Sequence, residues 1–451
     1  MKISDILLST NGVLLSGDIN FYINSFKIDS RCLSSDDIFI AIKGDKFDGN
    51  SFVLNVLNGN SVGVIFDGDI NIDINNYKDK VIIKVDDSIK ALQDMARYKR
   101  SLYDIPVVAI TGSVGKTSTK DIVASVMSEK YNVLKTEGNH NNHIGLPLTL
   151  LELKDHTAMC IEMGMNHFNE ISLLTNILKP TIAVITNVGT AHIGNLGSRE
   201  NILKAKLEIL EGLSSDGTII INNDNDLLNS WYSLDTKYNK VSYGIENKSD
   251  FMAYNINSLI DKSTFDIKVK DQVYDVLVPV PGLHFIYNSL CAISVGNVLG
   301  INNNKIIDGI KKFELSKNRM EIIKLKEGIE LISDCYNANY DSMKAAIEIL
   351  GKYKTRKIAV LGDMLELGDY SKELHQKIGK LVDINNIDIL ICVGELSKYI
   401  YESSNICKYM CKDNKEAIEL LKSIIKSNDI ILFKASNSMN FIEIVKKIEK
   451  I

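Results

Sequence analysis

The pattern of apolar and polar positions divides the chain into sections with different rhythms. In the first section, short apolar runs such as 62–66 and 81–85 alternate with turns, which predicts strands with a few helices. Ser88 then looks like the N-cap of a helix and marks the start of a second section. We therefore expect a small N-terminal α/β domain at residues 1–87.

From residue 106 onward, apolar runs alternate with helical segments. This β-then-α rhythm is typical of a parallel sheet with helical crossovers, and it predicts a central domain at residues 88–315. The predicted elements of this section are strands 107–111, 158–163, 181–186 and 218–221, helices 116–129, 170–178, 199–213 and 284–299, and a hairpin formed by 265–269 and 273–277.

The third section, at residues 316–451, begins with a hairpin that turns at Glu327 and Gly328. It continues as a second α/β unit, in which ligands are expected at the carboxyl ends of the strands. Its predicted elements are helices 342–350 and 372–382 and strands 357–361, 387–393 and 430–434. The predicted fold class is therefore α/β with three domains, a central parallel-sheet phosphate-binding domain flanked by an N-terminal α/β domain and a C-terminal Rossmann-like domain.

Composition narrows the class of protein. The formal net charge is −5 and no long basic run occurs, which argues against nucleic acid as a partner. No apolar stretch approaches the roughly 18 residues of a membrane-spanning helix, and the first residues do not have the pattern of a signal peptide. Seven scattered cysteines without a C-x-x-C pair favour a reducing compartment, so we expect a cytoplasmic protein.

The segment V-V-A-I-T-G-S-V-G-K-T at 107–117 carries the strongest chemical signal. A buried strand leads into a Gly-rich turn, and Lys-Thr opens a helix whose N-terminus attracts phosphate. Lys116 is expected at the terminal phosphates of a nucleotide, and the Thr117 hydroxyl at Mg²⁺. The loop has the shorter G-x-x-G-K-[ST] form, because Ile110 occupies the position of the usual first glycine. An ordinary strand–helix turn with two glycines is the alternative interpretation.

Polar side chains follow the next two strands at the same edge of the predicted sheet. Glu162 suits a metal ligand there, although a lone strand-end Glu is more often solvated. His192 could join it, although a lone His is more often structural. The segment G-N-H-N-N-H at 138–143 predicts hydrogen bonding to a polar ligand, because Asn is a poor ligand for transition metals. Three side chains would serve this role: Asn139, Asn141 and Asn142.

Taken together, these motifs resemble the Mur ligases over nearly the whole chain. Matching segments occur in all three sections: I-D-S-R at 28–31, F-I-A-I-K-G at 39–44 with Asp48-Gly49, T-G-S-V-G-K-T-S-T-K at 111–120, K-T-E-G-N-H-N-N-H-I-G at 135–145, E-M-G-M-N at 162–166, N-V-G-T-A-H at 187–192, Y-N-A-N at 336–339, D-S-M at 341–343 and L-G-D-M-L-E-L-G at 361–368. The resemblance implies an ATP-dependent amide ligase of bacterial cell-wall synthesis. It implies ATP and Mg²⁺ as cofactors, and UDP-N-acetylmuramoyl tripeptide and D-alanyl-D-alanine as substrates. A monomer is expected.

The resemblance also implies roles for individual residues. Lys116, Lys206, His192 and Glu162 would be catalytic, and Mg²⁺ would be held by Thr117, Glu162, His192 and Lys206, the last as a carbamate. ATP would be bound by Gly112, Ser113, Val114, Gly115, Lys116, Thr117, Ser118, His284, Asn288, Arg319 and Asp334. The other substrates would be bound by Ser30, Arg31, Lys43, Gly44, Asp48, Gly49, Asn139, Asn141, Asn142, Asn337 and Asn339.

The chain departs from the family pattern at three places. Phe285 replaces an Asn that contacts adenine, Tyr340 replaces a Pro after Y-N-A-N, and K-A-S-N at 434–437 replaces K-G-S-R. The last change loses an Arg in the section that handles the amine. A sister ligase, including one like folylpolyglutamate synthase, therefore remains an alternative. A small-molecule kinase and a non-catalytic paralogue are the alternatives outside this class.

Overall fold

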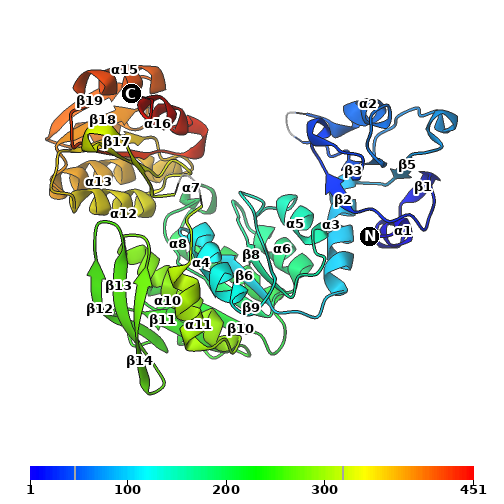
Figure 1. Cartoon of the computed structure of the whole chain (residues 1–451), viewed down its shortest axis with the longest axis horizontal. Helices are drawn as coiled ribbons and strands as arrows, with labels where there is room; N and C mark the ends of the chain where they lie inside the picture. The colour runs from blue at the N-terminus through cyan, green and yellow to red at the C-terminus, as the bar shows by residue number, and fades with distance from the viewer. Residues whose placement is uncertain (45–46, 317–318, 451) are drawn as a thin grey trace.

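The computed structural model describes residues 1–44, 47–316 and 319–450 of the chain. Its strands form three separate sheets, one in each predicted section, so the three-domain α/β architecture is confirmed (Figure 1). The central domain lies between the other two, and the N-terminal and C-terminal domains stand on either side of it.

The N-terminal sheet has the strand order β1-β5-β4-β3-β2. Strand β1 is antiparallel to β5, and the other neighbours are parallel. The elements are β1 Val13–Ser16, β2 Ser25–Lys27, β3 Asp37–Ile40, β4 Gly63–Phe66, β5 Val81–Lys84, helices α1 Ile3–Thr10 and α2 Val53–Leu57, and 3-10 turns η1 Ser30–Cys32, η2 Gly49–Phe52 and η3 Ile74–Tyr77.

The central sheet has nine strands in the order β14-β13-β12-β11-β10-β9-β6-β8-β7. It is parallel from β12 to β7, and β13 and β14 form the predicted hairpin at its other end. The strands are β6 Val107–Thr111, β7 Val133–Lys135, β8 Ala158–Glu162, β9 Ile182–Ile185, β10 Thr218–Asn222, β11 Asn239–Gly244, β12 Phe251–Ser258, β13 Ser263–Val269 and β14 Gln272–Val278. The helices are α3 Ser88–Ser101, α4 Lys116–Ser128, α5 Gly145–Leu151, α6 Glu170–Leu178, α7 Ile193–Leu196, α8 Arg199–Leu207, α9 Asp226–Tyr232, α10 Leu283–Val298 and α11 Asn303–Lys311, with the turn η4 Glu208–Glu211.

The C-terminal sheet has the order β15-β16-β20-β17-β18-β19, and only β15 is antiparallel to its neighbour. Its strands are β15 Glu321–Lys324, β16 Glu330–Ser333, β17 Lys357–Gly362, β18 Ile389–Val393, β19 Cys407–Cys411 and β20 Ile430–Lys434. Its helices are α12 Tyr340–Gly351, α13 Ser371–Ile384, α14 Lys398–Ser403, α15 Asn414–Ile424 and α16 Ile442–Ile448, with the turns η5 Lys326–Gly328, η6 Gly368–Tyr370 and η7 Asn437–Met439.

The N-cap predicted at Ser88 is wrong by one residue. The Asp87 carboxylate accepts a hydrogen bond from the Lys90 N–H at 2.8 Å and caps α3, whereas Ser88 is already helical. The helix predicted at 199–213 also ends early, because the chain tightens into η4 after Leu207. Strands β7, β11, β12 and β19 were missed because their apolar patterns are short or broken.

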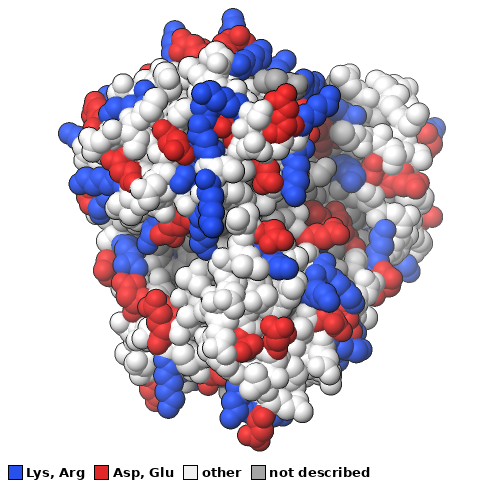
Figure 2. Space-filling model, turned by 60° about the vertical axis from the view of Figure 1, so that its left-hand side comes forward, with Lys and Arg blue, Asp and Glu red and all other residues white. Residues whose placement is uncertain are grey.

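Helix α3 connects the first two domains. Its Ala91, Leu92 and Met95 side chains are buried in the core of the N-terminal sheet, while the Arg100 Nε donates to the Leu178 carbonyl of the central domain at 2.8 Å. The domain limits at 87 and 315 therefore remain predictions. In the described ranges, no helix has the length and apolar character to cross a membrane. On the face shown in Figure 2, basic and acidic side chains are interspersed.

Candidate functional site

The candidate site lies where the carboxyl ends of the central strands meet the C-terminal domain. Strand pairing sets Ile110 of β6 opposite Glu162 of β8, and Thr111 opposite Ile185 of β9. The segments that follow these strands therefore emerge side by side, as expected for a parallel sheet. They line a cavity of about 420 Å³, whose other side is formed by Arg319, Asp334 and residues of α12.

The phosphate loop is shaped by two glycines. A Cβ on Gly112 would come within 1.9 Å of the Thr186 hydroxyl, and Gly115 caps α4 with a φ of 79°. The N–H groups of Ser113 and Val114 already donate to the backbone and side-chain oxygens of Asn187. The unpaired donors left for a phosphate are therefore the first N–H groups of α4, which lack partners within the helix.

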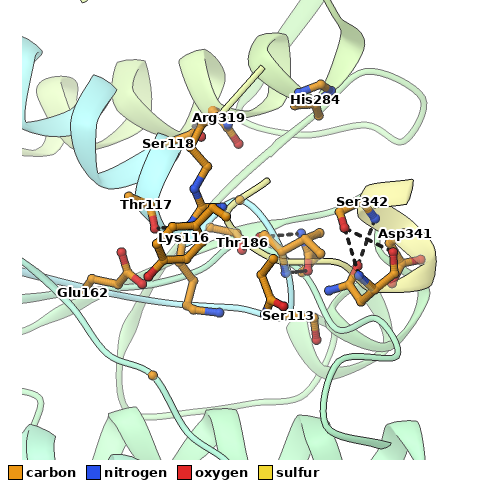
Figure 3. A pocket seen from close by; sticks show the side chains of 18 of the residues that line it. Ser113, Lys116, Thr117, Ser118, Glu162, Thr186, His284, Arg319, Asp341 and Ser342 are labelled. Carbon is orange, nitrogen blue, oxygen red and sulfur yellow. Dashed lines mark hydrogen bonds between the residues drawn. The ribbon is translucent and has the colours of Figure 1, made fainter. Parts of the chain in front are cut away.

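Lys116 folds back across this loop. Its Nζ donates to the Gly112 carbonyl at 2.8 Å, and Figure 3 shows its side chain beside Glu162. Burial lowers the pKa of Lys116, Glu162 opposes this shift, and the Arg319 charge adds to it. A bound phosphate would lie near this ammonium, so it would both compensate the burial and favour the charged form.

Glu162 offers an unsatisfied oxygen to the cavity. Its side chain is 2% exposed, and the Asn141 amide donates to its Oε1 at 2.7 Å. Its Oε2 is buried and has no hydrogen-bond partner among the residues that the structure describes. A buried carboxylate oxygen without a donor is unfavourable unless a cation or proton fills the place. The donor set therefore fits a hard divalent cation at this point, with the Thr117 hydroxyl as a second oxygen.

His192 lies at the same edge, in the loop between β9 and α7. It lines the cavity, and its backbone has a left-handed φ of 62°. Its Nδ1 is 2.7 Å from the Glu366 Oε2 of the C-terminal domain. This close polar contact joins the loop that carries His192 to the C-terminal domain.

Lys206 is fully enclosed in α8, with 1% of its surface exposed. Burial lowers its pKa well below the ordinary value, and the nearby Lys116 charge lowers it further. Within the described residues, no hydrogen bond or ion pair of its side chain is present. These surroundings favour the neutral amine, which is the form that reacts with CO₂. Lys204, two residues earlier on the same helix, is exposed.

The predicted base-binding residues lie at the start of α10. Asn288 accepts a hydrogen bond from the Thr119 hydroxyl at 3.0 Å, and its buried Nδ2 has no hydrogen-bond partner in the ranges that the structure describes. Burial lowers the pKa of His284 to about 4, so this ring is neutral at physiological pH. Phe285 is 1% exposed and stacks obliquely on His284 with ring centroids 4.3 Å apart. Phe285, which replaces the family's Asn, therefore packs against the His284 ring and offers no polar group to a ligand.

Arg319 reaches the phosphate loop from the C-terminal side. Its guanidinium donates to the Thr117 hydroxyl at 2.9 Å across 202 residues of sequence, and it lies 3.8 Å from the ring centroid of Tyr336. Its buried Nε has no hydrogen-bond partner within the described part of the chain. Asp334 forms a buried ion pair with Lys434 at 2.5 Å. Arg319 therefore brings a positive charge from the C-terminal side to the phosphate loop.

The remaining departures have structural explanations. Tyr340 is the first residue of α12, the position where Pro is tolerated but not required. Lys434 donates to the Asn337 carbonyl at 3.1 Å, and the Asn437 amide donates to the Tyr336 carbonyl at 3.0 Å. The K-A-S-N segment therefore supports the backbone of Y-N-A-N.

Several of the asparagines predicted to bind substrate also make hydrogen bonds within the protein. Asn142 accepts from the backbone N–H of Ile144 and Gly145 at the start of α5, and Asn339 caps α12 by accepting from Ser342 at 2.9 Å. The Asn141 side-chain amide donates to Glu162, as described above. All three line the cavity, as do Asn139 and Asn337.

The predicted N-terminal residues do not line this cavity. Arg31 is exposed, and its guanidinium pairs with Asp29 at 2.7 Å, which holds the pKa of that carboxyl at about 2. Together with Ser30 it forms the turn η1 after β2. Lys43 and Gly44 follow β3, and the backbone of Lys43 pairs with that of Asp48 in an isolated antiparallel β-bridge. Gly49 is required because a Cβ there would come within 2.6 Å of the Ile42 backbone.

Three residues that shape the site have no individual role in the sequence-based predictions. Asn187 holds the phosphate loop, and its place directly after β9 could have suggested this. Tyr336 stacks on Arg319, which no local pattern indicates. Asp341, labelled in Figure 3, accepts from the Thr190 N–H and hydroxyl at 3.2 and 3.3 Å, and so connects two domains.

Comparisons with known proteins agree with this geometry. Family models match in three places: the Mur ligase family catalytic domain at residues 22–100, the Mur ligase middle domain at 110–296, and the Mur ligase glutamate ligase domain at 318–437. The UDP-N-acetylmuramoyl-tripeptide–D-alanyl-D-alanine ligase of Bacillus subtilis is 37% identical over 94% of this chain and 93% of its own length.

Two solved structures share the whole architecture. The crystal structure of MurF from Acinetobacter baumannii is 28% identical, with a TM-score of 0.91 over 100% of this chain and 99% of that one. MurF ligase from Thermotoga maritima, solved in complex with ADP, is 27% identical, with a TM-score of 0.84 over 95% and 97% of the two chains. With matches in all three domains and a relative at this identity over almost its full length, the chain belongs to the Mur ligase family.

Proposed function

We propose that this protein is an ATP-dependent ligase that joins D-alanyl-D-alanine to a UDP-N-acetylmuramoyl tripeptide in peptidoglycan synthesis. The observation that carries the proposal is the meeting of two domains at one phosphate site, where Arg319 of one domain bonds Thr117 in the phosphate loop of the other. The curated relative from Bacillus subtilis carries the name of this activity, and the related Thermotoga structure binds ADP.

The reaction would proceed in two steps. ATP would phosphorylate the terminal carboxylate of the tripeptide, and the amine of the dipeptide would then displace phosphate from the acyl phosphate. Lys116 and Arg319 would neutralise the charge on the transferring phosphoryl group from opposite sides. The first N–H groups of α4 would hold the remaining phosphate oxygens. Closure of the C-terminal domain would exclude the water that hydrolyses an acyl phosphate.

Mg²⁺ would be held by Thr117 and Glu162 at one point and by His192 and the Lys206 carbamate at another. The unpaired Glu162 Oε2 and the buried, unpaired Lys206 support this assignment. When bound, the cation supplies charge that stabilises the phosphoryl group. His284 and Asn288 would contact the base and Asp334 the ribose. The N-terminal turns with Arg31 and Lys43 would bind the UDP part. A cytoplasmic location and a monomeric state remain predictions.

The decisive experiment measures phosphate and ADP release with a panel of UDP-muramoyl peptides and candidate amines. We expect release only when the tripeptide and D-alanyl-D-alanine are both present, with the amide product seen by mass spectrometry. ADP release that needs no amine would indicate a kinase instead. A different productive pair would indicate a sister ligase, and no release with any pair would indicate a non-catalytic paralogue.

A further inference from the structure

Two family motifs of the C-terminal domain contact the loop that carries His192. The Asp341 carboxylate of D-S-M accepts from Thr190, as described above. Glu366, in L-G-D-M-L-E-L-G, makes two contacts: its side chain lies 2.7 Å from the His192 Nδ1, and its carbonyl accepts from the Gly194 N–H at 3.2 Å. The roles proposed above do not use Glu366, although it belongs to a motif that identifies the family.

The contact is built with unusual backbone on both sides. His192 has a φ of 62° and Glu366 a φ of 65°. Left-handed backbone at residues other than glycine costs on the order of 1 kcal/mol or more, and it persists where the surroundings require it. The two backbone segments also approach each other closely, because a Cβ on Gly194 would come within 2.6 Å of the Gly368 nitrogen. The strained conformations thus face each other across a tight interface between two domains.

The pairing has a direct chemical consequence for the ring. A carboxylate beside Nδ1 favours the tautomer with its proton on that nitrogen, which leaves the Nε2 lone pair free for a cation. The Glu366 side chain is 52% exposed, so it has the freedom to turn from the present close contact into a directed hydrogen bond.

We propose that Glu366 is a positioning residue for His192, which orients the imidazole toward the second Mg²⁺ and makes that site depend on docking of the C-terminal domain. The inference rests on the proposed function, since it uses His192 as a ligand. It adds that the domain bringing the amine also completes the metal site of the ATP domain. The cation would then be held tightly only after this domain has docked.

The test compares Mn²⁺ binding to the full chain and to Glu366→Gln, measured by electron paramagnetic resonance with a non-hydrolysable ATP analogue. We expect the weaker of two bound ions to lose affinity by about tenfold or more, as is usual for the outer partner of a metal-bound His. The apparent Mg²⁺ requirement of turnover should rise in parallel, and excess Mg²⁺ should restore turnover.

Two further variants separate positioning from general structure. Tyr370→Phe removes another bond between the same domains, from the Tyr370 hydroxyl to the Gly197 carbonyl at 3.1 Å, without touching His192. It should bind Mn²⁺ like the parent chain. In a His192→Ala background, Glu366→Gln should cause no further loss.

The inference is overturned if Glu366→Gln binds Mn²⁺ like the parent chain, or if it weakens binding equally with His192 absent. The ligation assay on the parent chain is read separately. A parent chain that ligates with unaltered Mn²⁺ binding in Glu366→Gln refutes only the role of Glu366, whereas a parent chain without ligation refutes the proposed function.

Discussion

Arg319 is the residue whose replacement tests the proposed mechanism most directly. Its bond to the Thr117 hydroxyl is a hydrogen bond from a charged donor, worth about 1.5–3 kcal/mol. Its stacking on Tyr336 adds about 0.5–2 kcal/mol. Together these contacts hold the guanidinium in place with about 2–5 kcal/mol, and each 1.36 kcal/mol corresponds to about tenfold in rate.

Three variants separate these contributions. Arg319→Lys keeps the charge but loses the planar fork and the flat stacking, so we expect acyl-phosphate formation to slow by roughly 10²-fold or more. Arg319→Ala also removes the charge opposite Lys116, and we expect a loss of about 10³-fold or more. Tyr336→Leu removes only the stacking, which should reduce the rate by a factor of about 2 to 30.

The assay is rapid-quench ADP formation in a single turnover, which isolates phosphoryl transfer from attack by the amine. Thermal unfolding of each variant serves as the control for folding, and calorimetry with ATP separates binding from chemistry. The proposed role of Arg319 in phosphoryl transfer would be refuted if Arg319→Lys matched the parent chain, or if Arg319→Ala lost ATP affinity but kept its single-turnover rate.

Three other predictions concern Lys116, Arg31 and Lys206. Lys116→Ala should abolish ATP-dependent ligation with an unchanged unfolding midpoint, and wild-type turnover in this variant would exclude the phosphate-loop assignment. Arg31→Ala should weaken the UDP-linked substrate in calorimetry and leave ATP affinity unaltered, and the reverse result would contradict the domain roles. Lys206→Ala should be nearly inactive while the exposed Lys204→Ala stays nearly normal. Mass spectrometry under bicarbonate should find the carbamate on Lys206, and an active, metal-loaded enzyme with unmodified Lys206 would refute it.

The elements around the phosphate loop could be predicted because their signals are local. The apolar run of β6, the two glycines and Lys-Thr lie within eleven consecutive residues, and β6 and α4 begin at the residues predicted. The same holds for α6, whose limits agree at both ends. Strand β7 has only three residues, and the C-K-Y-M-C run of β19 is interrupted by a Lys, so neither shows a recognisable apolar run. Both form beside a neighbouring strand that offers hydrogen bonds.

The residue types of the site were also predictable, but several of their present partners were not. Asn142 and Asn339 were expected to meet a ligand, which stays a prediction. In the structure Asn142 accepts from the Gly145 N–H at the start of α5, and Asn339 caps α12. The N–H groups of Ser113 and Val114 were expected near phosphate, yet they donate to Asn187. An amide side chain forms hydrogen bonds with whichever backbone groups the fold brings close to it. The sequence alone does not show which groups those are.

By itself, the sequence determined the three α/β sections, the phosphate loop and the Mur ligase motifs, because periodicity and residue order act within one turn or strand. Only the tertiary structure decided which groups meet between domains: Arg319 with Thr117, and Glu366 with His192. It also decided that Lys206 is buried while Lys204 is exposed. These pairings depend on how sheets and helices pack over distances of many residues, where the favourable contact appears only after the chain has folded.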